Sequence, residues 1–254
     1  MILAVDVGNT ETVLGLFREL EPLGCWRIST DRHRTGDELG LLVSGFLAGL
    51  ETGATGAVVG SVVPVLDRSW AQACHSVGLE PRFLNGASEL PVRLEVDAPL
   101  EVGADRIANT LAAAELFRRD TIVVDLGTAT TFDCIRADGA FLGGVIAPGP
   151  RAGIERLTAV ATQLPQVEIR SPPRVIGRRT VDCVDSGVFY STVSAIDGIV
   201  ERILAEWKPT DPLIVATGGL AEVVAPHCKT VERVEPFLTI TGLAIADRYL
   251  RGKG

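Results

Sequence analysis

The chain has 254 residues, enough for one large domain or two modest ones with a substantial buried core. Hydrophobic residues make up 46% and charged residues 22%, which is ordinary for a globular protein. The net charge of −8 and the lack of a basic cluster argue against a nucleic-acid partner. The longest apolar stretch, residues 39–50, is too short to span a bilayer, so we expect no membrane contact.

Five cysteines and three histidines are scattered along the chain, without a Cys-x-x-Cys pair. An odd number of dispersed cysteines favours free thiols, which are typical of the reducing cytoplasm. The same dispersion argues against a transition-metal centre. Met1 is followed at once by a strand-like run that contains Asp6, so we expect no secretory signal and predict a cytoplasmic protein.

The first half of the chain is predicted to form three strands followed by alternating helices and strands. Runs of β-branched and aliphatic residues at 2–7 and 12–17 flank a Gly/Asn turn, which predicts a hairpin. The further predicted elements are a strand at 23–29, a helix over 36–50, a strand at 56–61, a helix over 64–77 that begins with Pro64, a strand at 81–85 and a helix over 104–119.

The second half repeats this order. Its predicted elements are strands at 121–126, 130–135 and 139–148, a helix over 150–162, a polar segment at 163–179, a long helix over 180–207, a strand at 212–217, a helix that opens within 218–224, a strand at 229–233 and a closing helix over 237–250. We therefore predict an α/β protein with two similarly folded domains, 1–118 and 119–254, and a cleft between them.

One phrase occurs twice, as AVDVGNTET at 4–12 and as VVDLGTATT at 123–131. Glycine at such a bend permits positive φ and close approach of a ligand, and backbone N–H groups and Asn or Thr side chains can donate to phosphate oxygens. The aspartate repels phosphate and fits such a site only with a cation between them. One Asp-x-Gly-x-Thr sequence is ordinary turn chemistry, but two copies in matching strand contexts favour a clamp for a polyphosphate.

A third glycine-rich stretch, VATGGLAEVV at 215–224, places Gly218 and Gly219 between a predicted strand and a predicted helix. Adjacent glycines there allow the backbone to approach a ligand and direct a helix N-terminus at it. A connection that simply needs a flexible turn explains the same stretch equally well.

The segments DVGNTET, DLGTATT and ATGGL resemble the phosphate-1, phosphate-2 and adenosine motifs of the superfamily of sugar kinases, acetate kinase, actin and heat-shock ATPases. From end to end the chain is similar to type III pantothenate kinases, notably in STDRHRTGDE (29–38), VGADRIAN (102–109), GGVIAPG (143–149) and TVDCVDSG (180–187). The resemblance implies two ribonuclease-H-like domains of βββαβαβα order with ATP in the interdomain cleft. It also implies a homodimer that uses ATP to phosphorylate pantothenate to 4′-phosphopantothenate, the first step of coenzyme A biosynthesis.

The resemblance assigns the catalytic and substrate-binding residues. Asp105 corresponds to the proton acceptor, and the segment Gly103, Ala104, Asp105 and Arg106 to the pantothenate contacts. By position alone, Asp105 also fits a plain helix-start residue that complements the helix dipole. Thr180 corresponds to a further substrate contact, and threonine is also a good helix N-cap, so both roles can coexist.

The resemblance assigns the ATP and cation sites as well. Asp6 is the candidate for Mg²⁺, through water, because magnesium sheds its waters reluctantly. Asp125 corresponds to the residue that binds a monovalent cation, K⁺ or NH₄⁺, and Thr128, Gly218 and Gly219 to further ATP contacts. The chain has no Walker lysine motif, so cations and backbone donors must neutralise the phosphates. The segment that corresponds to the ATP-phosphate loop comprises Asp6, Val7, Gly8, Asn9, Thr10, Glu11, Thr12 and Val13.

Two positions depart from the family pattern. Val96 stands where relatives commonly have a tyrosine that contacts substrate, and Arg179 replaces the asparagine of a Gly-Lys-Asn-Thr segment. The Arg179 guanidinium either grips the pantothenate carboxylate or faces solvent. The alternatives to a pantothenate kinase are a kinase or phosphatase for another small substrate on the same scaffold, and a nucleotide-binding regulator. The presence of Asp105 favours the enzyme over the regulator.

Overall fold

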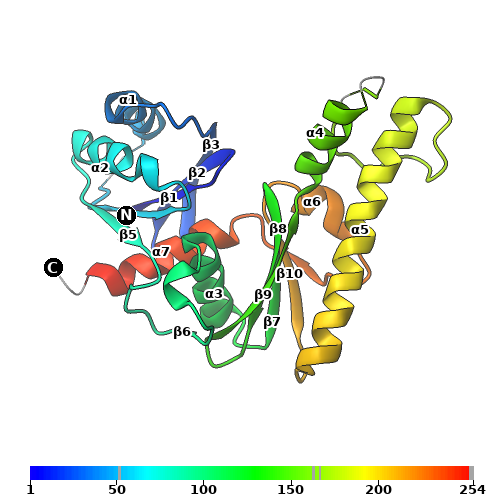
Figure 1. Cartoon of the computed structure of the whole chain (residues 1–254). Helices are drawn as coiled ribbons and strands as arrows, with labels where there is room; N and C mark the ends of the chain where they lie inside the picture. Colours follow the sequence, from blue (N-terminus) through cyan, green and yellow to red (C-terminus); the bar gives the residue numbers. More distant parts are fainter. Residues whose placement is uncertain (51–52, 162–163, 166, 252–254) are drawn as a thin grey trace. The chain divides into compact units, whose positions relative to one another are not determined.

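The computed structural model describes residues 1–50, 53–161, 164–165 and 167–251, and it divides into two compact units (Figure 1). One unit comprises Met1–Leu116 with Leu238–Gly254, and the other Phe117–Phe237. Residue 162 of the predicted helix over 150–162, and residues 163 and 166 of the predicted polar segment, lie outside the described residues. None of the helices that the structure describes is both long and apolar enough to cross a bilayer.

The closing helix α7 (Leu238–Leu250) corrects the predicted domain boundary, because it belongs to the first unit and not to the second. Thr239 donates a hydrogen bond to the buried Asn109, and a Cβ on Gly242 would collide with the backbone of Ala108. The helix is therefore held closely against residues more than 100 positions earlier. Its apolar pattern predicts a buried helix but does not reveal which sheet it covers.

The first unit contains a five-stranded sheet in the order β3-β2-β1-β4-β5. β1 is antiparallel to β2 and parallel to β4. The elements are β1 (Ile2–Val7), β2 (Glu11–Arg18), β3 (Glu21–Ser29), α1 (Gly36–Leu47), β4 (Ala57–Ser61), the 3-10 turn η1 (Pro64–Leu66), α2 (Asp67–Ser76), β5 (Pro81–Leu84), the two-residue β6 (Arg93–Leu94), the 3-10 turn η2 (Pro99–Glu101) and α3 (Ala104–Leu116).

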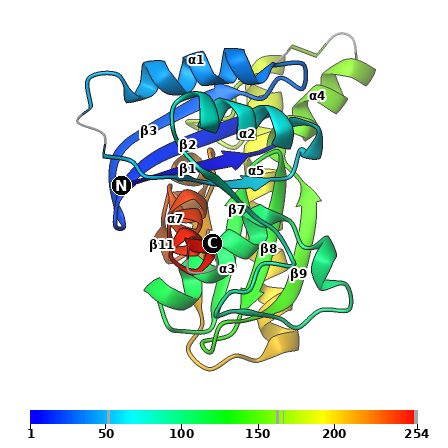
Figure 2. The same cartoon turned by 90° about the vertical axis from the view of Figure 1, so that its left-hand side faces the viewer.

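The alternation of side chains along β1 explains how this sheet is covered on both faces. Leu3, Val5 and Val7 pack into one core cluster with residues of α1 and α2, whereas Asp6 points to the opposite face, where α3 and α7 lie (Figure 2). Helix α1 begins with a capping box, because Thr35 accepts from the Glu38 N–H and the Glu38 side chain accepts from the Thr35 N–H.

The second unit repeats the architecture with strands in the order β11-β10-β7-β8-β9. The strand predicted at 229–233 is wrong in extent, since β11 starts only at Arg233. The elements are β7 (Thr121–Leu126), β8 (Ala129–Ile135), β9 (Ala140–Pro148), α4 (Pro150–Val160), α5 (Thr180–Trp207), β10 (Leu213–Thr217), α6 (Ala221–Val224), the 3-10 turn η3 (Ala225–His227) and β11 (Arg233–Val234).

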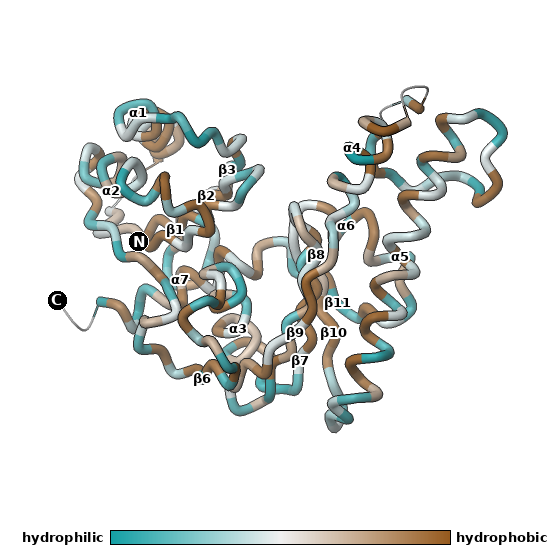
Figure 3. Tube along the Cα trace, viewed as in Figure 1, coloured by the Kyte–Doolittle hydropathy of each residue, from teal (hydrophilic) through white to brown (hydrophobic). Residues whose placement is uncertain are grey.

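Hydropathy follows this architecture in the second unit. Apolar residues line its strands, and α5 alternates between hydrophobic and hydrophilic positions along its length (Figure 3). Phe189, Val193, Ile196 and Val200 of α5 pack on one face of the sheet. The spacing of these residues places them on one side of the helix, so the other side remains polar.

The two sheets match down to a local irregularity. In the first, the partner of β2 jumps from Gly24 to Pro22, and in the second, the partner of β8 jumps from Gly143 to Phe141. The skipped residues, Leu23 and Leu142, are separated by 119 positions, as are Asp6 and Asp125. A β-bulge kept at the same place in both copies shows one fold used twice.

Candidate active site

The first bend connects β1 to β2 and follows Asp6 directly. Asp6 pairs with Val13 of β2 and with Gly60 of β4. The Gly8 N–H donates to the Glu11 carbonyl at 3.1 Å. Gly8 does not adopt the positive φ that glycine permits. A Cβ there would lie 2.7 Å from the Glu11 carbonyl oxygen, so this close approach is what requires glycine.

The end of β3 anchors this bend. The Thr30 N–H donates to the Thr10 carbonyl at 2.8 Å, and the hydroxyls of Thr30 and Thr12 are 2.8 Å apart. These contacts tie the loop that follows β3 to the bend. The segment STDRHRTGDE therefore acts, at its start, as a support for the predicted phosphate loop.

Two guanidinium groups lie beside the first bend, and the sequence reasoning did not single them out. Arg32 donates to the Asn9 side-chain oxygen at 3.1 Å, and Arg27 pairs with Glu11 at 2.7 Å. Arg32 belongs to a segment that carries the family resemblance, which is the signal that identifies it. Arginine suits phosphate oxygens because its donors form a planar fork.

Helix α3 begins at the same edge of this sheet. A Cβ on Gly60, the strand neighbour of Asp6, would lie 3.5 Å from the Ala104 Cβ, and one on Gly103 would lie 3.4 Å from Val62. Asp6 and Gly60 share a face of the sheet, and Asp105 follows Ala104 directly. The structure therefore brings the predicted base and the first bend together within one unit.

Asp105 has the environment of a proton acceptor. Asp105 is only partly exposed, and its burial raises its pKa. The Arg106 N–H donates to Asp105 Oδ1 at 2.8 Å, and this hydrogen bond and the Arg106 charge both oppose the rise. Asp105 lies inside the first turn of α3, not at the N-cap position. A carboxylate whose pKa is raised is a stronger base than an ordinary aspartate.

The second bend connects β7 to β8 and follows Asp125. Asp125 pairs with Thr131 of β8 and with Thr217 of β10, and the Gly127 N–H donates to the Ala129 carbonyl at 3.0 Å. Gly127, like Gly8, does not adopt the positive φ that glycine permits. A Cβ on Gly127 would make only ordinary contacts, the nearest at 3.6 Å, so the fold itself does not require glycine there.

The backbone of two other glycines packs closely against the second bend. Gly218 has φ +90°, and a Cβ on it would collide with Asp125 Oδ1 and the Leu126 backbone. A Cβ on Gly149 would collide with the Thr128 carbonyl oxygen. The structure therefore brings Asp125, Thr128 and Gly218 together, and Gly219 continues the same connection into α6.

The residues present fit oxygen-binding cations at both bends. An aspartate stands at the start of each bend, and the buried hydroxyl of Thr217, the strand neighbour of Asp125, has no hydrogen-bond partner among the residues that the structure describes. Among the described residues, no group of three or more His, Cys, Asp or Glu could hold a metal ion. A cation at either bend would therefore need ligands beyond side-chain carboxylates, such as hydroxyls, water or phosphate oxygens.

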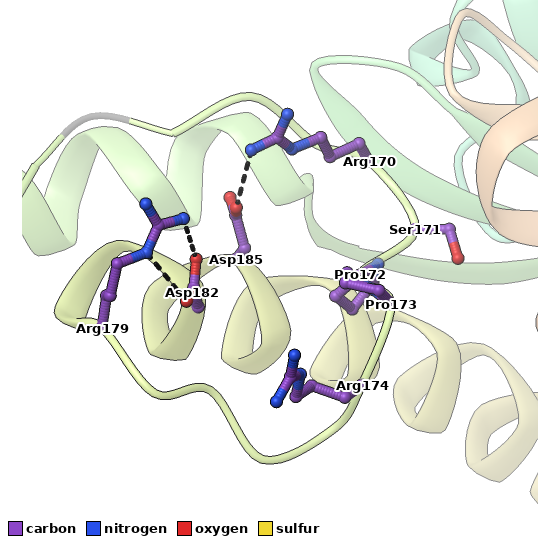
Figure 4. Close-up of a pocket in the computed structure, with 8 residues that line it drawn as sticks. All are labelled: Arg170, Ser171, Pro172, Pro173, Arg174, Arg179, Asp182 and Asp185. Carbon is purple, nitrogen blue, oxygen red and sulfur yellow. Dashed lines mark hydrogen bonds and ion pairs between the residues drawn. The ribbon is translucent and has the colours of Figure 1, made fainter.

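Thr180 and Arg179 lie in the second unit, at the start of α5. Arg179 is exposed and makes two hydrogen bonds to Asp182, at 2.7 and 3.1 Å, which lower the pKa of that carboxyl. In this structure the Arg179 guanidinium faces solvent and pairs with Asp182, which is the second of the two predicted alternatives. Arg179 lies beside a cavity of about 360 Å³. The residues that line this cavity, drawn in Figure 4, are Arg170, Ser171, Pro172, Pro173, Arg174, Arg179, Asp182 and Asp185.

Comparison with known proteins identifies the family. The family model of type III pantothenate kinases matches residues 2–202. A type III pantothenate kinase from Acidothermus cellulolyticus is 45% identical over 96% of this chain and 97% of its own length. Another from Syntrophotalea carbinolica is 43% identical over the full length of both chains. The chain belongs to the type III pantothenate kinase family.

Solved structures confirm the fold at much lower identity. A Campylobacter jejuni protein assigned to the Baf family of transcriptional activators aligns with a TM-score of 0.60 at 19% identity, over 97% of each chain. A ROK family glucokinase from Streptomyces griseus aligns with a TM-score of 0.56 at 14% identity, over 99% of each chain. At these identities the likeness shows the fold alone. As a member of its family, this pantothenate kinase is an ATP-dependent phosphotransferase of coenzyme A biosynthesis.

Proposed function

We propose that this kinase transfers the γ-phosphate of ATP to the 4′-hydroxyl of pantothenate, with Asp105 as the base and as a cytoplasmic homodimer. The observation that carries the residue assignment is the position of Asp105, whose raised pKa suits proton transfer, at the sheet edge that holds Asp6. The resemblance of Gly103–Arg106 to the family's substrate segment supports pantothenate as the molecule placed there. The dimer rests on the family resemblance.

The reaction needs a positioned hydroxyl and a place for its proton. The hydroxyl oxygen forms a bond to the γ-phosphorus, the bond from that phosphorus to the bridging oxygen breaks, and ADP leaves. Asp105 takes the hydroxyl proton as the new bond forms. Arg106, next to it, carries a positive charge that helps to keep Asp105 ionised before the transfer.

The bends hold the nucleotide in this proposal. Backbone donors of the first bend, together with Arg32, bind the β- and γ-phosphates, and Asp6 holds Mg²⁺ through water. Mg²⁺, when bound, withdraws charge from the transferring phosphate. Thr128 contacts ATP at the second bend, Gly218 and Gly219 receive the adenosine, and Asp125 holds K⁺ or NH₄⁺. Thr180 contacts pantothenate.

Release of ADP by the purified protein, measured with ATP, Mg²⁺ and KCl, tests this proposal. We expect release to depend on pantothenate and to fail with sugars and other small acids. Asp105→Asn should lower kcat at least 100-fold with little change in ATP affinity, because the fold and the phosphate loop stay intact. Glu101→Gln, which changes an exposed acid four residues earlier, is the matched control and should keep full activity.

Three outcomes would contradict parts of the proposal. ADP release that continues at the same rate without pantothenate would indicate a phosphatase. Turnover by Asp105→Asn at the rate of the unaltered protein would remove Asp105 from the role of base. A single species at twice the chain mass in light scattering is the result expected for the homodimer, and a monomer that turns over at full rate would exclude it.

A further inference from the structure

The side chains of Asp125 and Thr217 lie on the same face of the second sheet. Residues 122, 124 and 126 of β7, and residues 214 and 216 of β10, all point into the core that α5 covers. Alternation along a strand therefore directs Asp125 and Thr217 to the opposite face. The two residues are direct neighbours in the parallel register of β7 and β10, so their side chains stand next to one another.

Thr217 is the one threonine among the described residues whose fully buried hydroxyl lacks a hydrogen-bond partner. Thr217 is 1% exposed, and its Oγ1 has no hydrogen-bond partner among the described residues. Thr121, at the other end of the same pair of strands, donates to the Arg119 carbonyl at 2.9 Å, and Thr110 donates to the Arg106 carbonyl at 2.8 Å. A buried hydroxyl without a partner is costly, and a ligand bound to this oxygen would remove that cost.

We propose that the Thr217 hydroxyl oxygen is a ligand of the monovalent cation at Asp125, a proposal that rests on the cation site assigned above. The hydroxyl offers lone pairs that K⁺ can coordinate and that an N–H of NH₄⁺ can donate to, so one atom serves either cation. Asp125 supplies the negative charge beside it. Gly218 leaves room for this arrangement, because any side chain there would displace the Asp125 carboxylate.

The first repeat shows why this ligand belongs to one bend only. Gly60 occupies the place beside Asp6 that Thr217 occupies beside Asp125. A Cβ on Gly60 would lie 2.8 Å from Leu243 and 3.5 Å from Ala104, so apolar side chains fill the space. The first bend therefore has no hydroxyl at the matching position, and a cation there depends on water and phosphate oxygens instead.

A titration with KCl, with choline chloride holding the ionic strength constant, tests the inference through the thermal unfolding midpoint. A ligand that binds the folded state raises the midpoint with its concentration, which yields an apparent Kd without any activity assay. Thr217→Val keeps the shape and removes the hydroxyl. We expect it to raise the apparent Kd for K⁺ at least tenfold, and to unfold in choline chloride alone no earlier than the unaltered protein does.

Matched variants separate a cation ligand from a structural hydroxyl. Thr217→Ser keeps the oxygen and should stay within about threefold of the original K⁺ affinity. Thr121→Val removes a satisfied buried hydroxyl, and should lower the midpoint in every salt without changing the K⁺ affinity. If Thr217→Val binds K⁺ as tightly as the unaltered protein and Asp125→Asn does not, Thr217 is not a ligand, although the cation site at Asp125 exists. Absence of a K⁺ effect in the unaltered protein would remove the site and the inference together.

Discussion

The two aspartate bends occupy the same place in two copies of one fold, yet their neighbours differ. Asp6 lies next to Gly60 and the start of α3. Asp125 lies next to Thr217, and the backbone of Gly218 packs closely against it. The duplicated sheet fixes where each carboxylate stands, and the neighbouring strand fixes what surrounds it. A repeated motif can therefore hold the same place in two sheets and differ in its chemistry.

The bends also differ in length. Val7 pairs with Thr12 across the first, and Leu126 pairs with Thr130 across the second, so the first bend holds one residue more. The extra residue presents one more N–H group in the bend that we assign to the transferred phosphates. The Thr30 N–H supports this longer bend by donating to the Thr10 carbonyl.

Exchange of each aspartate for asparagine is the strongest test of the difference. Asp6→Asn should lower kcat/KM about 100- to 1,000-fold, because transition-state charge is stabilised less, and should raise the Mg²⁺ concentration that is needed. Asp125→Asn should instead raise the half-saturating KCl concentration at least tenfold. Steady-state assays with each cation varied in turn measure both effects. If the two variants respond to the same cation, the two bends do not have different roles.

Gly218 gives the largest expected effect on stability. Gly218→Ala puts a Cβ at φ +90° and against the Asp125 carboxylate, and should lower the free energy of unfolding by about 1–3 kcal/mol. Gly127→Ala meets ordinary contacts only and should stay within about 0.5 kcal/mol. Urea unfolding measures both. Equal losses in the two variants would show that Gly218 is not under strain.

Much of this architecture could be predicted from the sequence, because hydrophobic alternation and turn residues are local signals. The bends and all but the shortest strands follow from them. The packing of α7 does not, since an apolar helix face carries no record of its partner. The contact of Gly218 with Asp125 and the pairing of Thr217 with Asp125 depend on strand order. Once β7 and β10 are known to be parallel neighbours, the register places both residues at the site.

The arginines at the first bend should give an intermediate effect. Arg32→Ala should raise KM for ATP about tenfold, because it removes a charged donor next to the bend. Arg27 already pairs with Glu11, so Arg27→Ala should raise it less than about threefold. The second repeat has no arginine at the place of Arg27, because Ile146, 119 positions later, occupies the matching place. Steady-state kinetics at saturating pantothenate measure both values, and a larger effect for Arg27 would reverse the assignment.

The pKa of Asp105 predicts how activity depends on pH. Burial raises this pKa, so the acidic limb of the profile of kcat/KM should lie at higher pH than an ordinary aspartate, near 4, would give. The profile should fall tenfold for each pH unit below the midpoint of that limb. A limb at or below the ordinary value would contradict the assignment.

The raised pKa of Asp105 also predicts a small change in stability with pH. Because the folded protein holds the Asp105 proton more tightly than the unfolded chain, ionisation above the folded-state pKa costs stability. That cost shrinks as the pH falls through the folded-state pKa, and it is absent below the unfolded value. Asp105→Asn keeps an oxygen that can accept the Arg106 N–H and carries no charge. It should therefore be more stable than the unaltered protein at pH 7, with the difference closing toward pH 4 in urea unfolding. A variant that is less stable at pH 7 would show that the Asp105 carboxylate stabilises the start of α3. The raised pKa would then no longer support Asp105 as the base at the first bend, in contrast to Asp125 as a cation ligand at the second.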